Sequence, residues 1–266
     1  MDSHRSLAVF AAGVAGKARL PLMSAETIDT IQARAGETFL PGPVLLLGAP
    51  GVGKGTQAQI LMAEFAVPQV STGDLLRANI RRGTELGKTA KSLMDAGQLV
   101  PDDVVNEMVK ARLAQADAVN GYILDGYPRT LGQADWLDGH LASASALTLD
   151  LVAVSIRVDQ GELLRRITGR RTCPTCKRIY NIYSHPATVD GICDSDGTKL
   201  VQRSDDTEAA FVERMKAYDA QTEPVIEHYR SQGRFAEVDG AASVGAVGAA
   251  VRAELRRLRS AGKPGA

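Results

Sequence analysis

The sequence is poor in aromatic residues, in cysteine and in net charge, and each shortage excludes a class of protein. Aromatic residues make up 5% of the 266 positions, which leaves little material for stacking the bases of a single strand. Thirty-one basic residues balance 31 acidic ones, so no net positive charge favours a nucleic-acid partner. Three cysteines, an odd number, do not make a disulfide framework.

Long hydrophobic runs are also missing. No run approaches the roughly 20 apolar residues that a membrane-spanning helix needs. The apolar stretch 7–16 follows Arg5 and is similar to the hydrophobic part of a signal peptide, but no clear cleavage site follows it. A role of the leader in targeting to an organelle is weakened by Asp2 and Glu26. We therefore expect a cytoplasmic protein with no membrane partner.

Residues 1–41 form a leader that has no clear hydrophobic period. A short helix over residues 24–34, capped by Ser24, is one interpretation of it. Disorder is another, and translation starting at Met23 is a third. The sequence leaves these alternatives open, and it also leaves a low-complexity tail at residues 260–266 unassigned.

From Val44 onward, short apolar runs alternate with amphipathic segments. The run 44–47 is apolar throughout, as expected for a strand buried on both faces. Alternation of strands with helices predicts a parallel β-sheet with helices on both faces. Further strands are expected at 67–70, 122–124, 151–158 and 235–238. Helices are expected at 56–65, 73–82, 86–96, 102–116, 131–141, 160–167, 207–231 and 242–259.

A glycine-rich turn, Gly-Ala-Pro-Gly-Val-Gly-Lys-Gly-Thr, occupies residues 48–56 between the first expected strand and the first expected helix. In that context glycines let the backbone N–H groups wrap closely around phosphates, and Lys54 adds a charge near the transferring phosphoryl group. The general phosphate-loop pattern places Ser or Thr directly after the lysine. Here Gly55 occupies that position and Thr56 follows it. This departure from the general pattern indicates a particular subfamily of phosphate-loop proteins.

The segment 170–206 interrupts the alternation and contains every cysteine of the chain. Cys173 and Cys176 form one knuckle, and Cys193 with Asp196 forms a second one after sixteen residues. Three thiolates and a carboxylate match a closed tetrahedral zinc site, which predicts structural Zn²⁺. Asp194 is the rival fourth ligand, with poorer spacing. About 37 residues cannot bury a core unaided, so a metal would supply folding energy.

Four blocks in a fixed order carry a resemblance to a known family. They are Gly-Ala-Pro-Gly-Val-Gly-Lys-Gly-Thr-Gln at 48–57, Ser-Thr-Gly-Asp-Leu-Leu-Arg at 71–77, Gly-Gln-Leu-Val-Pro-Asp at 97–102 and Leu-Asp-Gly-Tyr-Pro-Arg-Thr at 124–130. Over residues 43–259 the chain resembles the adenylate kinases, in their long bacterial form with a zinc-bearing lid. The resemblance implies a P-loop fold and a monomer that transfers the γ-phosphoryl group of Mg·ATP to AMP, giving two ADP.

The resemblance also implies a domain organisation. A core domain would comprise residues 42–70, 101–168 and 207–259. Residues 71–100 would form the domain that binds the nucleoside monophosphate, and residues 169–206 would form the lid. Asp125, at the end of an expected strand, would hold the water shell of Mg²⁺, which prefers oxygen ligands; a helix cap or turn is the alternative role for this residue.

The residues expected to bind ATP lie in the phosphate loop and before the lid. They are Gly51, Val52, Gly53, Lys54, Gly55, Thr56, Arg166 and Arg170. Phosphoryl transfer needs positioning and charge stabilisation more than covalent chemistry. The residues expected to act in catalysis are Lys54, Arg129, Arg166, Arg203 and Arg214.

The AMP site is expected at the second and third blocks and the strand end near residue 126. Its residues are Thr72, Arg77, Gln98, Leu99, Val100, Gly126, Arg129, Gln133, Arg203 and Arg214. Guanidinium groups match a phosphate geometrically, so Arg77 and Arg129 would clamp the acceptor, while Gln133 would read the base edge. The resemblance also implies that Thr72 favours AMP, because related kinases for UMP and CMP tend to carry a small apolar residue at this position. Rival readings are a kinase with another acceptor or donor, and a zinc-ribbon binding module with a degenerate phosphate loop.

Overall fold

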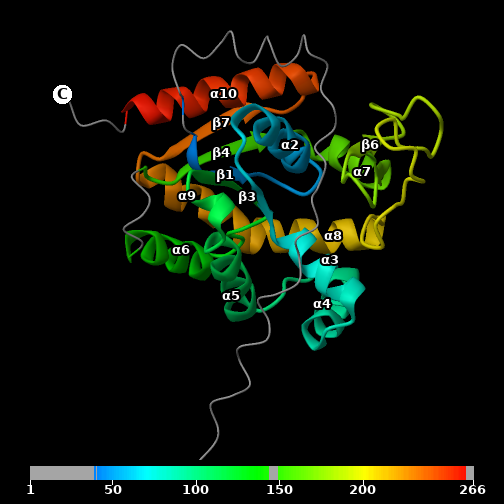
Figure 1. The fold of residues 1–266 in the computed structure, drawn as a ribbon, viewed down its shortest axis with the longest axis horizontal. Coiled ribbons are helices and arrows are strands. Elements are labelled where there is room, and N and C mark those ends of the chain that lie inside the picture. Colours follow the sequence, from blue (N-terminus) through cyan, green and yellow to red (C-terminus); the bar gives the residue numbers. More distant parts are fainter. Residues whose placement is uncertain (1–38, 40, 144–148, 262–266) are drawn as a thin grey trace, which may run out of the picture. The chain divides into compact units, whose positions relative to one another are not determined.

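The computed structural model describes residues 39, 41–143 and 149–261, so the leader helix expected over residues 24–34 lies outside the described residues. Five strands pair in parallel and in the order β2-β3-β1-β4-β7 (Figure 1). Their bounds are β1 Gly42–Leu47, β2 Gln69–Ser71, β3 Gly121–Asp125, β4 Val152–Arg157 and β7 Phe235–Asp239. The parallel sheet predicted from the sequence is confirmed.

Helices cover both faces of this sheet, because each strand buries side chains on both sides. In β1, Val44 and Leu46 join one hydrophobic cluster, whereas Leu45 and Leu47 join the other. The first cluster is covered by α2 (Lys54–Phe65) and α10 (Val244–Ala261). The second is covered by α5 (Asp102–Leu113), α6 (Leu131–Ser143) and α9 (Glu223–Ser231) (Figure 1).

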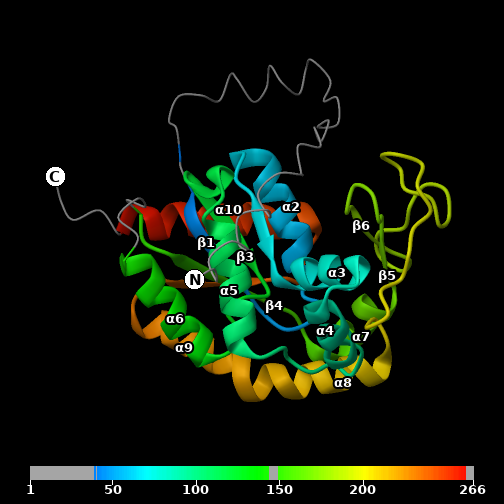
Figure 2. The same ribbon diagram turned by 60° about the horizontal axis from the view of Figure 1, so that its bottom comes forward.

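Two further groups of elements flank the sheet. α3 (Thr72–Arg82) and α4 (Glu85–Asp95) pack side by side, as Figure 2 shows, because Gly87 lets its helix approach the Asn79 carbonyl closely. After α7 (Gln160–Thr168), the short strands β5 (Arg170–Thr172) and β6 (Ile179–Asn181) form an antiparallel ribbon. Throughout the described part of the chain, every helix is too short or too polar to cross a membrane.

The helix expected over residues 207–231 is present over residues 208–231, but it is not α-helical throughout. The structure has α8 (Glu208–Ala217), a π-helical turn at Tyr218–Thr222 and then α9. Pro224, at the start of α9, has no N–H to give to the preceding turn, so an unbroken α-helix would lose a hydrogen bond there. The wide turn places Pro224 in the first turn of a new helix, where that N–H is not needed.

The carboxyl ends of the strands meet at one edge of the sheet, which is where parallel α/β proteins bind ligands. β1 leads into the glycine-rich turn and α2, β2 leads into α3, and β4 leads toward α7. β3 ends at Asp125 and runs into the segment that carries Arg129. The candidate residues therefore come from separate stretches of the chain but are expected at the same edge.

Candidate functional site

The glycine-rich turn has the backbone conformation that its glycines permit. Gly48, Gly51 and Gly53 have φ values of 129°, 91° and 105°, a region that side-chain-bearing residues rarely adopt. A Cβ on Gly48 would lie 2.3 Å from the carbonyl oxygen of Ile156, so no larger residue fits there. Gly53 caps the start of α2, whose first N–H groups therefore point into the turn.

Lys54 folds back over this turn. Its Nζ donates to the carbonyl oxygen of Gly48 at 2.6 Å and to that of Ala49 at 3.1 Å. Burial lowers the pKa of Lys54 to about 8, and the neighbouring carboxylate of Asp125 opposes that shift. The ammonium group is therefore easily deprotonated and poorly solvated, so an anion in the turn would stabilise it.

Asp125 is the last residue of β3, and Gly126 follows it, beside the phosphate loop. One carboxylate oxygen of Asp125 accepts from Gln69 Nε2 at 2.8 Å, and it would lie 3.5 Å from a Cβ on Gly55. Thr72 Oγ1 donates to the Gly126 carbonyl at 2.7 Å, which ties the start of α3 to the end of β3. An acidic oxygen thus lies directly over the phosphate loop, as a cation partner of phosphates would require.

Arg129 is fixed at three points. Its Nε donates to the Gly126 carbonyl at 2.7 Å, and its backbone N–H donates to Gln133 Oε1 at 2.8 Å. Its own carbonyl accepts from Thr222 Oγ1, in the π-helical turn, at 2.9 Å. The backbone carbonyl of Gly126 therefore aims the guanidinium group, and Gln133 and Thr222 hold the backbone from opposite sides.

Six cationic side chains gather at this edge, each of them within electrostatic reach of at least one other. They come from the phosphate loop, α3, the segment after β3, β5, the segment before α8, and α8 itself. They are Lys54, Arg77, Arg129, Arg170, Arg203 and Arg214. The sequence predicted each of them as a nucleotide ligand, and the structure brings all six together.

Burial disfavours the positive charge of four members of this cluster, Lys54, Arg129, Arg203 and Arg214, whereas the contact with Asp206 raises the pKa of Arg170. Burial, together with repulsion from Arg170 and Arg77, lowers the pKa of Arg203 to about 10. Burial also lowers the pKa of Arg214 to about 10, against the attraction of Asp205. These guanidinium groups stay charged at neutral pH, but each has lost water that a bound phosphate would replace with stronger hydrogen bonds.

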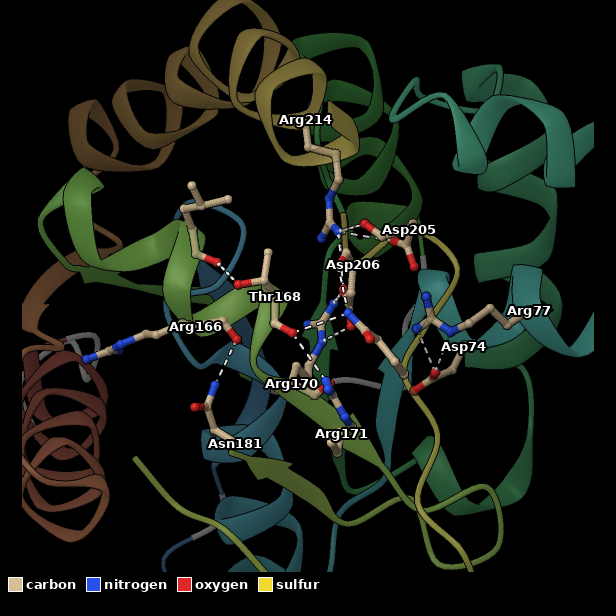
Figure 3. Close-up of polar contacts among 12 residues, drawn as sticks. Asp74, Arg77, Arg166, Thr168, Arg170, Arg171, Asn181, Asp205, Asp206 and Arg214 are labelled. Carbon is tan, nitrogen blue, oxygen red and sulfur yellow. Dashed lines mark hydrogen bonds and ion pairs between the residues drawn. The ribbon is translucent and has the colours of Figure 1, made fainter. Parts of the chain in front are cut away.

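Carboxylates hold the arginines in place (Figure 3). Asp74 accepts from Arg77 at 2.7 Å. Burial raises the pKa of Asp74, but the charge and hydrogen bond of Arg77, together with Arg203 and Ser71, bring it below its ordinary value. Asp206 is fully buried and pairs with Arg170 through both oxygens. Arg214 Nη1 contacts an oxygen of Asp205 at 3.1 Å. Such pairs keep the arginines oriented while the site holds no nucleotide.

Arg166 is the predicted ligand that does not join the cluster. Figure 3 shows its side chain pointing away from Arg170. Its guanidinium contacts Glu162 at 2.9 Å, the Val52 carbonyl at 3.5 Å and the Gly240 carbonyl at 3.2 Å. It therefore lies at the rim of the phosphate loop, beside the loop that follows β7.

Gln133 is 2% exposed, and both ends of its amide have partners. Oε1 accepts from the backbone N–H of Arg129, and Nε2 donates to Asp102 Oδ1 at 2.6 Å. The other oxygen of Asp102 accepts from Thr130 Oγ1 at 2.6 Å. Whether Gln133 reads a base stays a prediction, but the structure adds Asp102 and Thr130 as the residues that hold it.

Gln98, Leu99 and Val100 line a cavity of about 690 Å³ between their loop and α8. Glu213 and Lys216 line its other side. None of the predicted phosphate-binding arginines lines it, so this cavity is not the phosphate site.

Cys173, Cys176, Cys193 and Asp196 gather at the ribbon of β5 and β6, with their ligand atoms within 4.8 Å of one another. The sulfurs of Cys176 and Cys193 are 3.5 Å apart, close to the roughly 3.8 Å that 2.3 Å zinc–sulfur bonds in a tetrahedron would require. Asp194 instead accepts from the backbone N–H of Thr188 at 2.9 Å. Asp196, and not Asp194, therefore lies with the three cysteines, and this donor set fits a tetrahedral thiophilic metal.

Six contributors at this edge were not among the predicted site residues: Asp74, Asp102, Thr130, Asp205, Asp206 and Thr222. Asp205 and Asp206 follow Arg203 after one intervening residue, Ser204, and this closeness of opposite charges was a signal in the sequence. Thr222 gave no signal, because its hydrogen bond to the Arg129 carbonyl joins residues 93 positions apart.

The site combines a turn that wraps phosphates with a buried excess of guanidinium groups at the same edge of a parallel sheet. This combination defines a P-loop phosphotransferase that acts on two nucleotides.

A family model described as adenylate kinase matches residues 46–234. The chain is 48% identical over 213 residues to an adenylate kinase of Citrifermentans bemidjiense, a match that covers 80% of this chain and 99% of that protein. It is 49% identical over 201 residues to an adenylate kinase of Thermodesulfovibrio yellowstonii, covering 76% of this chain and 93% of that protein.

The chain therefore belongs to the adenylate kinase family. It is a phosphotransferase, and its reaction converts ATP and AMP into two molecules of ADP. The rival reading as a zinc-ribbon binding module is wrong, because the family match extends over most of the chain and the phosphate loop has its full geometry.

The lowered pKa of Lys54 predicts how activity depends on pH. We expect kcat/KM for ATP to fall above about pH 8, about tenfold per pH unit, because neutral Lys54 offers no charge to the phosphates. Bound ATP raises the pKa of Lys54, so kcat should hold to a higher pH than kcat/KM. Initial rates between about pH 6 and pH 10 measure both profiles.

The Lys54→Arg variant is the control, because its guanidinium stays protonated over the whole range. Its activity should be lower, yet it should show no decline near pH 8. A wild-type kcat/KM that stays flat to about pH 9.5 would contradict this assignment.

Proposed function

We propose that the six cations hold ATP and AMP end to end, with their phosphates meeting at the centre of the cluster. The observation that carries this proposal is the gathering of Lys54 and five arginines at the carboxyl edge of the sheet, where burial disfavours the charge of four of them: Lys54, Arg129, Arg203 and Arg214. Two nucleotides with their phosphates together would bring enough negative charge to balance them.

On the ATP side, the N–H groups of residues 51–56 and the start of α2 surround the β- and γ-phosphates. These residues are Gly51, Val52, Gly53, Lys54, Gly55 and Thr56. When ATP binds, Lys54 Nζ leaves the carbonyl oxygens of Gly48 and Ala49 and donates to phosphate oxygens, because a phosphate in this turn lies within reach of the same side chain. Arg166, at the loop rim, contacts the nucleotide from the side of Val52 and Gly240.

On the AMP side, Arg77 and Arg129 clamp the phosphate, and Thr72 and Gly126 lie beside the nucleoside. Gln133 reads the base edge, with Gln98, Leu99 and Val100 as its neighbours. Arg77 leaves Asp74 when the phosphate arrives, because a dianionic phosphate attracts a guanidinium more strongly than one carboxylate does.

Transfer requires no nucleophile from the protein, since an oxygen of the AMP phosphate is already ionised. Arg170, Arg203 and Arg214 neutralise the charge that spreads over the moving phosphoryl group. Asp205 and Asp206 keep Arg214 and Arg170 aimed at it. Closure of a lid over bound nucleotides, an established behaviour of adenylate kinases, excludes the water that would hydrolyse ATP.

Mg²⁺ would be held near Asp125, whose carboxylate lies over Gly55 of the phosphate loop. When bound, Mg²⁺ neutralises the β- and γ-phosphates and leaves Asp125 to hold its water shell. The proposed domains follow from these roles: residues 71–100 carry the AMP ligands Thr72, Arg77, Gln98, Leu99 and Val100, and residues 169–206 form the lid.

The lid metal is proposed to be structural Zn²⁺. The small lid buries a cluster made of Cys173, Tyr180, Cys193 and Leu200, two of which are metal-ligand candidates. So little apolar area cannot stabilise 38 residues unaided, which supports a metal as the source of their folding energy. We also propose a cytoplasmic monomer: all the proposed ligands come from one chain, and reduced thiols suit a zinc site in a reducing compartment.

The test of substrate choice is a panel of nucleoside monophosphates with ATP as the donor. We expect ADP formation with AMP to exceed the rates with UMP, CMP and GMP by about two orders of magnitude or more, because the site would pair with the polar edge of adenine. A mimic joining two adenosines through five phosphates should bind more tightly than either substrate. A preferred acceptor other than AMP would overturn the proposed AMP site.

Arg129 gives a direct test of the phosphate clamp. We expect Arg129→Ala to lower kcat/KM for AMP by about 10²–10³-fold, because a preoriented charge on the acceptor is lost. Circular dichroism should show the wild-type melting curve to within a few degrees. Arg257→Ala is the matched control, since Arg257 pairs with Glu254 on the surface of α10. Near-normal turnover by Arg129→Ala would contradict its role.

The metal site is tested with two neighbouring aspartates. We expect about one zinc per purified chain, and a much lower content with a lower Tm in Asp196→Ala, because the fourth ligand is lost. Asp194→Ala, which loses only the bond to the Thr188 N–H, should keep its zinc. Elemental analysis and thermal melting measure both, and equal zinc loss in the two variants would contradict the assignment of Asp196.

A further inference from the structure

The hydrogen bonds around Gln133 fix more than its position, because they also fix which end of its amide is the acceptor. A carboxamide has a donor end and an acceptor end of nearly the same shape, and either can be turned toward a given neighbour. At Gln133 the two neighbours have opposite and fixed character. The backbone N–H of Arg129 can only donate, and the ionised carboxylate of Asp102 can only accept.

The reversed amide is therefore disfavoured at both ends. Gln133 Oε1 would then face the Asp102 oxygen that now lies 2.6 Å from Nε2, and two acceptors would repel each other. Nε2 would face the Arg129 N–H that now lies 2.8 Å from Oε1, with two donors opposed. Since Gln133 is 2% exposed, little water is available to relieve either conflict.

Asp102 is itself held rigidly enough to impose this orientation. It is the first residue of α5, where a negative charge is favoured by the helix dipole. Its second oxygen accepts from Thr130 Oγ1 at 2.6 Å, and that hydroxyl accepts from the backbone N–H of Gln133 at 3.1 Å. Asp102 thus closes a ring of hydrogen bonds that joins the start of α5 to the start of α6.

We propose that Asp102 is a positioning residue that sets the enzyme's preference for adenine by fixing the orientation of the Gln133 amide. The proposal rests on the proposed role of Gln133 as the reader of the acceptor base. After its two internal bonds, Gln133 keeps one N–H of Nε2 and one lone pair of Oε1 for a ligand. Adenine offers an acceptor, N1, next to a donor, the 6-amino group, and so complements one amide orientation.

Hypoxanthine, the base of IMP, offers the reverse pattern, because its N1 carries a hydrogen and its 6-position is a carbonyl oxygen. An amide held in the orientation that suits adenine opposes donor to donor and acceptor to acceptor when IMP enters. An amide free to turn accepts either base. The ratio of kcat/KM for AMP to that for IMP therefore reports the orientation of Gln133 and not the stability of the fold.

The experiment measures that ratio, with ATP as donor, in four variants beside the wild type. We expect Asp102→Ala to raise KM for AMP with a smaller change in kcat, and to lower the AMP-to-IMP ratio by about tenfold, the effect of one lost hydrogen bond. Asp102→Asn should recover most of the ratio. Its carbonyl oxygen can accept from Gln133 Nε2, and its amide nitrogen can donate to Thr130 Oγ1.

Asp103→Ala is the matched control, because Asp103 is an exposed acid in the same first turn of α5 and has the same favourable relation to the helix dipole. It should leave the ratio unchanged. Gln133→Leu tests whether Gln133 reads the base, separately from the positioning role of Asp102. If it alters neither KM for AMP nor the ratio, Gln133 does not read the base, and the proposed role fails together with the inference.

If Gln133→Leu lowers the ratio but Asp102→Ala leaves it at the wild-type value, only the positioning role of Asp102 is overturned. An equal loss of kcat/KM for AMP and IMP in Asp102→Ala, with a lower Tm, would also overturn it, since that is the signature of a purely structural contact. A selective fall in the ratio that Asp102→Asn restores and Asp103→Ala does not produce supports it.

Discussion

The constraint on which the site depends is the crowding of positive charge. Lys54, Arg77, Arg129, Arg170, Arg203 and Arg214 lie close enough to disturb one another, in surroundings where water only partly screens them. Such an arrangement opposes folding unless neighbouring groups offset it. Three aspartates do so here: Asp74 at Arg77, Asp206 at Arg170 and Asp205 at Arg214. Each contact also has a functional consequence, because it orients a guanidinium before a phosphate arrives.

The need to offset the positive charge and still release the arginines to a substrate explains why their internal partners are aspartates, which carry one negative charge each. A phosphate dianion with three oxygens competes well against such a carboxylate, so the arginines can be transferred to substrate without leaving the cluster. Preorientation removes part of the ordering cost of binding, and the internal aspartates prevent the empty site from opening under its own repulsion. Asp206 holds its arginine more firmly than the other two aspartates do, because it is fully buried and contacts Arg170 with both oxygens. Arg170 is therefore the cation least able to leave its internal partner.

Sequence patterns predicted those features that depend on local chemistry or on uniform burial. The strand 44–47 was recognisable because both of its faces are covered, so every residue is apolar. The phosphate loop was recognisable because its backbone needs glycine at fixed positions. Pairing across the fold was not recognisable: nothing near Thr222 indicates a bond to Arg129, and nothing near Asp102 indicates a bond to Gln133. Gln133 shows the difference well, because its role was expected from a motif while the bonds that orient it come from a helix 31 positions earlier.

The break between α8 and α9 shows how an apparent local defect contributes to the site. An α-helix running unbroken through Pro224 would lose a hydrogen bond, so the chain widens into a π-helical turn at Tyr218–Thr222. The turn changes the direction in which the side chains after it point. Arg214, before the turn, contacts Asp205 in the arginine cluster, and Thr222, at its end, contacts the carbonyl of Arg129. One segment of chain thereby holds two of the arginines at a fixed separation. Since Pro224 makes the unbroken helix unfavourable, the geometry that joins the two arginines is built into the covalent structure of the chain.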